Sequence, residues 1–197
     1  YLNIDFQITT TLPHADLVLT TFSDPNYVTR FDRADWDMPI PAIGFSTAVS
    51  TWNAAALAEG GLGAATVLNA IGYAMGLAFP HLAESGSVLM EGVDDDTDLG
   101  DFNLNQGIHT IMSFNDGWAT SGYGVSGSSN YGWQFGPMAL DIAVLQSIYG
   151  ANTTYNNGAN TYTLRDTNAA GTGWRAIWDT GGADTIVYAG TRNATID

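Results

Sequence analysis

Two acidic segments carry the side chains whose type and spacing best fit metal chemistry. In the first, Asp94, Asp96 and Asp98 place carboxylates at alternate positions, and Ca²⁺ takes oxygen ligands from such side chains and from backbone carbonyls. The segment departs from the EF-hand pattern, because Leu99 stands where that loop needs Gly and Asn105 stands where it needs a bidentate Glu. A calcium loop and an ordinary solvated acidic loop are therefore both open interpretations of these residues.

The second acidic segment reads Asp179-Thr-Gly-Gly-Ala-Asp184. Its glycines permit tight turns that expose backbone carbonyls, and its aspartates supply negative charge. The pattern is typical of part of the G-G-x-G-x-D calcium repeat. We therefore expect calcium as a cofactor here, held by the carboxylates of Asp179 and Asp184 and by the carbonyl of Gly181.

The histidines offer few routes to other chemistry. The chain has three of them, His14, His81 and His109, and it has no cysteine. No local Ser/His/Asp or Cys/His arrangement is present, and the glycine-rich stretch 59–63 lacks the Lys-Ser/Thr of a phosphate-binding loop. For His81 and His109 two interpretations stay open: ordinary hydrogen-bonded side chains, or ligands of a relocated metal site.

Composition excludes several classes of partner. The 197 residues include 20 Asp and Glu against 5 basic residues, for a net charge of −15. Such a surface repels phosphate backbones, so we expect no nucleic-acid partner. The excess acid fits either solubility in a salty exterior or calcium binding. Because apolar residues make up 45 % of the chain, a packed core can form and a disordered chain is excluded.

The apolar run over residues 64–79 needs a membrane test. It is about 16 residues long, whereas a spanning helix needs roughly 20. It also contains Asn69 and ends at Pro80. We therefore expect a buried helix and no membrane span.

Periodicity and turn residues predict a mixture of helices and strands. Alternating patterns predict strands over 2–9 and 15–22, followed by a loop from 23 to about 46. Helices are expected over about 64–78 and 138–149, the second starting near Pro137 and stopping at Gly150. From residue 152 the sequence turns to Asn, Thr and Gly with short strands, which predicts a domain boundary near 150. Since both ends of the chain fall inside strand-like runs, we expect both domains to be incomplete.

Four segments together resemble the serralysin-type metalloproteases, a metzincin group (peptidase family M10). That group carries H-E-x-x-H-x-x-G-x-x-H on a helix, followed by a Met-turn. The resemblance covers roughly residues 60–197, and the first 60 residues match only through their strand pattern. The four segments are Asn69-Ala-Ile-Gly-Tyr-Ala-Met-Gly-Leu-Ala-Phe-Pro80, Thr110-Ile-Met-Ser-Phe114, the stretch 136–152, and Ile177-Trp-Asp-Thr-Gly-Gly-Ala-Asp-Thr-Ile186.

The resemblance keeps the scaffold residues of this motif, such as Gly76 and the Met-turn residue Met112, and replaces the chemical ones. In place of the first His, the Glu, the second His, the third His and the Met-turn Tyr stand Asn69, Ala70, Tyr73, Phe79 and Phe114. Zinc prefers imidazole, thiolate or carboxylate ligands, and these side chains supply none of them. The sequence therefore predicts no zinc, no catalytic residues and no enzyme activity.

The resemblance also implies the architecture. We expect an α+β fold: a metzincin-like protease domain over 1–150, with a small mixed sheet, an active-site helix and a closing helix. The start of an RTX-type calcium-binding β-sandwich or β-roll domain should follow over 151–197. By the same resemblance, the stretch from Arg165 to Thr167 adds oxygen ligands to the calcium site of Asp179 and Asp184.

The favoured function is a catalytically inactive serralysin-like pseudoprotease. It would act as a structural or binding module of a secreted calcium-binding protein or a larger extracellular assembly, with protein or peptide partners. The resemblance implies a secreted or cell-surface bacterial protein, exported by a type I route through a C-terminal signal. The former cleft, lined by Tyr73, Phe79, Phe114 and Trp118, would either bind a peptide or be filled by its own aromatic rings.

Two alternatives are kept. One is an active zinc metalloendopeptidase with a relocated metal site. The other is glycan recognition by the Trp and Tyr side chains of the loop over 118–133.

Overall fold

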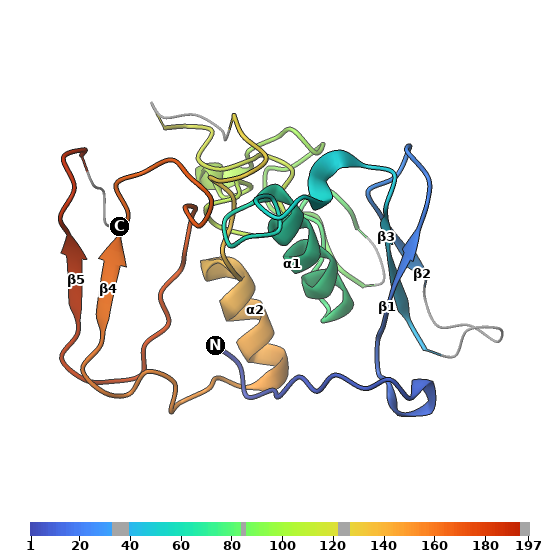
Figure 1. Cartoon of the computed structure of the whole chain (residues 1–197), viewed down its shortest axis with the longest axis horizontal. Helices are drawn as coiled ribbons and strands as arrows, with labels where there is room; N and C mark the ends of the chain where they lie inside the picture. Colours follow the sequence, from blue (N-terminus) through green and yellow to red (C-terminus); the bar gives the residue numbers. More distant parts are fainter. Residues whose placement is uncertain (33–39, 84–85, 122–126, 194–197) are drawn as a thin grey trace.

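The computed structural model describes residues 1–32, 40–83, 86–121 and 127–193. Two α-helices stand side by side in the middle of the molecule, with a three-stranded sheet on one side and a two-stranded sheet on the other (Figure 1). The fold is therefore mixed α and β, with few helices and small sheets, as the sequence predicts at this level. The division into domains at residue 150 stays a prediction.

The larger sheet has the order β1-β3-β2. Strand β1 (Val18–Phe22) runs parallel to the central strand β3 (Ala42–Ser46), and β2 (Thr29–Asp32) runs antiparallel to it. Both β2 and β3 lie where the sequence predicted a loop. The strand predicted over 2–9 is wrong, because only Leu2 forms an isolated bridge, with Ala151.

Helix α1 (Leu62–Ala74) is apolar and rich in small residues, and its side chains Ala65 and Ala70 are buried. The helix ends four residues before the predicted limit because Gly76 has a φ of +100°. That conformation is accessible to glycine and costly for other residues. Among the described residues, no helix is long and apolar enough to cross a membrane.

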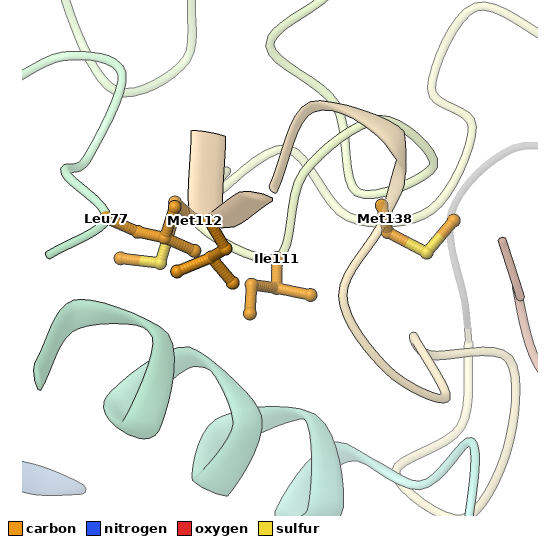
Figure 2. Close-up of a cluster of buried hydrophobic side chains, with 5 residues drawn as sticks. Leu77, Ile111, Met112 and Met138 are labelled. Carbon is orange, nitrogen blue, oxygen red and sulfur yellow. The ribbon is translucent and has the colours of Figure 1, made fainter. Parts of the chain in front are cut away.

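Helix α2 (Ala139–Tyr149) matches the predicted 138–149 to within one residue. Its first turn is capped by Asp141, whose carboxylate accepts a hydrogen bond of 2.8 Å from the backbone N–H of Met138. The helix contributes Leu145 to an apolar cluster, and the partly buried Leu68 and Tyr73 of α1 pack against that cluster. Its members are Leu77, Ile111, Met112, Met138 and Leu145, each at most 6 % exposed (Figure 2).

The C-terminal part holds strands β4 (Thr161–Leu164) and β5 (Thr185–Tyr188), which pair in parallel. A close backbone contact joins the segment between these two strands to the loop that precedes α2. A Cβ on Gly173 would lie 2.0 Å from the carbonyl oxygen of Trp133, so only glycine fits there. Next to it, Gln134 and Trp174 form a parallel bridge.

Short 3₁₀ turns complete the described elements. They cover Leu12–His14, Ser50–Trp52 and Asp101–Asn103.

Candidate functional site

Four aromatic side chains and His81 meet at the C-terminal end of α1, and we call this group the aromatic cluster. It consists of Phe31, Tyr73, Phe79, His81 and Phe114. The ring centroid of Tyr73 lies 4.6 Å from that of Phe31 and 5.4 Å from that of Phe79. Phe114 lies 5.3 Å from Phe79 and 4.8 Å from His81. Rings at such spacing stabilise one another beyond the area they bury.

The cluster gathers three of the four residues predicted to line the cleft. The fourth, Trp118, packs instead against Trp174, with ring centroids 6.3 Å apart. Phe31 and His81 were not assigned to the cleft from the sequence. Phe31 belongs to strand β2, which the sequence did not predict, so no local signal could have placed it there.

The remaining residues of the degenerate motif lie in α1 and on the Met-turn. The side-chain amide of Asn69 donates a hydrogen bond of 2.9 Å to the carbonyl oxygen of Ile111 and lies 3.7 Å from the sulfur of Met112. Ala70 is fully buried. Asn69 therefore connects helix α1 to the Met-turn, and its amide helps to hold the two at a fixed distance.

A buried carboxylate that sequence reasoning missed holds this turn in place. Asp141 is 2 % exposed and accepts hydrogen bonds from the Thr110 hydroxyl (2.6 Å) and from the Ile111 N–H (2.8 Å). Burial raises the pKa of Asp141, and the hydrogen bonds from Thr110, Ile111 and Met138 oppose that effect. The signal was an acidic residue in the first turn of a helix, but its distant partners could not be read from the sequence.

A groove opens beside the aromatic cluster, with a volume of about 560 Å³. Its lining includes Phe31 and residues 41–43 at the start of β3, together with residues 73–74 at the end of α1 and residues 76–79 that follow it. Leu17 and Leu82 also line the groove. The lining is mostly apolar, so the groove suits apolar side chains of a ligand.

The residues around the cluster do not form a recognisable zinc site. His81 is the only member of the cluster with an imidazole ring, and it packs against Phe79 and Phe114. Its buried Nδ1 atom has no hydrogen-bond partner. Within the described ranges, no three His, Cys, Asp or Glu side chains lie close enough to hold a metal ion. His109 lies on the Met-turn segment, where its carbonyl accepts from the Leu140 N–H, and His14 lies in the N-terminal 3₁₀ turn.

The first acidic segment uses its carboxylates to shape the backbone. Asp98 accepts hydrogen bonds from the N–H groups of Asp94 (2.9 Å) and Asp95 (3.2 Å). Asp95 accepts from both the hydroxyl and the N–H of Thr97, which lowers its pKa. Asp94 and Asp96 are exposed. The geometry is that of an acidic loop with local turns, and calcium at these residues stays a prediction.

The second acidic segment brings its two aspartates together with strand β4. Asp179 accepts hydrogen bonds from the Tyr162 hydroxyl and the Gly181 N–H, which together lower its pKa. Asp184 accepts a hydrogen bond of 2.9 Å from the N–H of Asn160, and its side chain also acts on the pKa of Asp179. Two carboxylates thus converge beside one turn.

Of the other predicted calcium ligands, Arg165 lies against Gly171 and Thr167 is exposed. The neighbouring Asp166, which the sequence did not single out, accepts from the Tyr188 hydroxyl and the Thr191 N–H. Its pKa is lowered by these bonds.

Comparison with known proteins gives this arrangement a context. The chain is 31 % identical over 147 residues to Serralysin C of Dickeya chrysanthemi, covering 66 % of this chain and 27 % of the relative. It is 31 % identical over 160 residues to Metallopeptidase AprA of Pseudomonas marginalis (68 % and 29 %). It is 29 % identical over 143 residues to Serralysin of Proteus mirabilis (66 % and 26 %). No protein-family model matches.

These similarities define the class as a metallopeptidase-related protein. More particularly, the chain is related to the serralysins, as its motifs predict. The chain spans little more than a quarter of the length of these relatives.

The prediction that the chain is not an enzyme is contradicted by these relatives. They are named serralysins or a metallopeptidase, which points to enzyme activity. The prediction that zinc is not bound has no support from them either. The physical reason is that a metal site is made by residues that meet in space. Losses within one sequence motif do not decide what the rest of the chain supplies.

Proposed function

We propose that this chain binds an extended polypeptide segment in the groove beside the aromatic cluster, as part of a secreted, calcium-binding protein related to the metallopeptidases. The observation that carries the proposal is the groove itself. It combines a volume of about 560 Å³ with a predominantly apolar lining, between a sheet and the end of a helix. The relatives named metallopeptidase or serralysin support a polypeptide as the ligand, since peptides are what peptidases act on.

The lining predicts which peptides fit. The aromatic rings of Phe31, Tyr73 and Phe79 and the aliphatic side chains of Ile43 and Leu77 form the walls. Burial of apolar surface contributes about 25 cal/mol per Å² removed from water. The preferred ligand is therefore a peptide with two or more large apolar side chains. It carries no strong negative charge, because the chain has a net charge of −15.

A fluorescein-labelled peptide, Ala-Val-Phe-Leu-Ala, tests the proposal by fluorescence anisotropy. Leu82 lines the groove and is 36 % exposed, so Leu82→Ala should weaken binding with little effect on folding. The matched control is Leu12→Ala, which changes an exposed leucine of the N-terminal 3₁₀ turn. Absence of binding, or equal loss in both variants, would refute the peptide groove.

A metallopeptidase with a relocated metal site is the second candidate. The unpartnered Nδ1 atom of His81, beside the groove-lining Phe79, favours it. The described residues do not complete a ligand set, so we assign no hydrolytic step to them. The same peptide, incubated with and without added zinc and followed by mass spectrometry, tests cleavage. His81→Ala should abolish both zinc retention and cleavage, whereas His14→Ala should change neither.

Calcium is proposed at the turns that precede β4 and β5. Its ligands would be Asp179, the carbonyl of Gly181 and Asp184, with further oxygens from Arg165 and Thr167. The convergence of two carboxylates in a chain this acidic supports a bound cation, because calcium takes its ligands from carboxylate and carbonyl oxygens. The broader role, a module of a larger extracellular assembly, rests on the same relationship.

A further inference from the structure

A second pocket lies away from the groove and shares no lining residue with it. It is lined by residues that include Glu59, Phe135, the turn at 155–156 and the segment 175–178, and it has a volume of about 230 Å³. It also uses no residue of the loop over 118–133. We propose that this pocket binds a single neutral pyranose ring of a glycan.

The pocket has aromatic walls, and two of the wall residues already use their polar atoms in hydrogen bonds. The Trp178 indole N–H donates to the carbonyl of Asn152 at 3.0 Å, and the Tyr162 hydroxyl donates to Asp179. The ring of Tyr155 stacks on Tyr1 at 6.1 Å, with 24° between the ring planes. These contacts fix the orientations of the rings that line the pocket. The C–H face of a pyranose is apolar and packs on such rings, while its hydroxyls stay at the rim.

A charged pair provides partners for the hydroxyls. Arg175 and Glu59 approach to 3.7 Å, and their side chains are 52 % and 71 % exposed. Direct charge-assisted hydrogen bonds are about 2.7–2.9 Å long, so the pair is loose enough to admit a hydroxyl. That hydroxyl donates to the carboxylate and accepts from the guanidinium. Arg175 is held in place because its Cζ atom lies 4.7 Å from the centre of the Phe135 ring.

Size and charge select the ligand class. Pockets for drug-sized ligands span about 300–1,000 Å³, so this smaller space suits one sugar ring. An anionic sugar is disfavoured because Glu59 faces the pocket and the whole chain carries −15. A purely apolar ligand would form no hydrogen bond with the Arg175–Glu59 pair. A neutral polyol ring satisfies both the walls and the charged pair.

Saturation-transfer NMR with methyl glucopyranoside, methyl galactopyranoside and N-acetylglucosamine tests the assignment on the full chain. At least one of them should bind with a Kd on the order of 1 mM, which is typical of a small site with few contacts. Tyr155→Ala should weaken binding at least about tenfold, whereas Tyr155→Phe should retain it because the ring forms the wall. Tyr27→Ala, which removes an exposed tyrosine outside the pocket, should leave it unchanged.

Three results would overturn the inference. One is the absence of binding for all three sugars. Another is undiminished binding by both Tyr155→Ala and Glu59→Gln, the second of which changes an exposed carboxylate and leaves the fold intact. The third is tighter binding of glucuronate than of the methyl glucopyranoside. Because the pocket and the groove share no residue, loss of peptide binding with retained sugar binding would refute the proposed function alone.

Discussion

The region of the aromatic cluster and the turns around β4 and β5, which carry Asp166, Asp179 and Asp184, place their carboxylates in opposite environments. The cluster packs its rings against one another, and the nearby Met-turn is bonded to a buried carboxylate, Asp141. The turns keep their carboxylates at the surface, bonded to hydroxyl and N–H groups. The two regions therefore differ in how exposed their aspartates are, and not in the type of acidic side chain. The same aspartate side chain has a raised pKa in the first region and a lowered pKa in the second.

Removing the buried carboxylate should give the largest change. Asp141→Ala leaves the donors of Thr110, Ile111 and Met138 without their acceptor. We expect the free energy of unfolding to fall by about 3 kcal/mol, measured by urea denaturation. The control Asp5→Ala changes an exposed aspartate and should shift it by less than about 0.5 kcal/mol. A similar small shift for Asp141→Ala would show that the Met-turn is held by packing alone.

Calcium binding at the turns around β4 and β5 should change the free energy of unfolding by nearly as much as Asp141→Ala does. At a free calcium concentration of 100 times Kd, the unfolding free energy should rise by about 2.7 kcal/mol, and EDTA should remove this gain. Asp184→Asn should weaken calcium binding in calorimetry, because it removes a carboxylate from the converging pair. Asp96→Asn is the matched control in the first acidic segment. If Asp96→Asn weakened binding instead, the calcium site would belong to that segment.

Truncation of the cluster should have a smaller effect. Phe79→Ala removes ring contacts with Tyr73, His81 and Phe114. Because the side chain is only partly buried, we expect a loss of about 2 kcal/mol, below the range for a fully buried Phe. Phe6→Ala, at a 71 % exposed position, should have no measurable effect. Equal melting temperatures for the two variants would mean that the rings are not a packed unit.

The smallest effects are the opposite titrations of the two regions. In ¹³C-detected NMR, Asp141 should titrate above the ordinary pKa of about 3.9, and Asp166 and Asp179 below it. Since the folded-state pKa of Asp141 is raised, its protonation adds stability as the pH falls through that pKa toward the unfolded value. For Asp166 and Asp179 the sign reverses. Their contribution is present above the unfolded pKa and is lost as the pH falls through the lowered folded pKa.

Local signals predicted the helices better than the sheets. Pro137 and Gly150 bracket α2, so its limits could be read from the sequence. For α1 the apolar run continued past Gly76, and only the backbone conformation there shows where the helix ends. Strands β2 and β3 were missed because their stability comes from pairing with each other and with β1, which local patterns do not report.

The sequence predicted which motif residues lie together at the candidate site, but it did not predict the residues from other segments that contact them. The motif positions Asn69, Tyr73 and Phe79 do lie beside Met112 and Phe114. The contributions of Phe31 and Asp141 depend on contacts across 30 or more residues, which no local spacing encodes. The enzyme question shows the same limit, because motif positions alone led to a conclusion that the relatives contradict.

The close approach of Gly173 to Trp133 bears on how this chain can be shortened. A protein ending at residue 150 would lose the partner of Gln134, the bridge between Leu2 and Ala151, and the strand-like cover over Trp133. Backbone groups now paired in the loop at 132–135 would face water. Any expression of the first 150 residues alone would therefore need a replacement for that cover. A protease acting on the intact chain should find the 170–175 segment a poor substrate, despite its loop-like sequence.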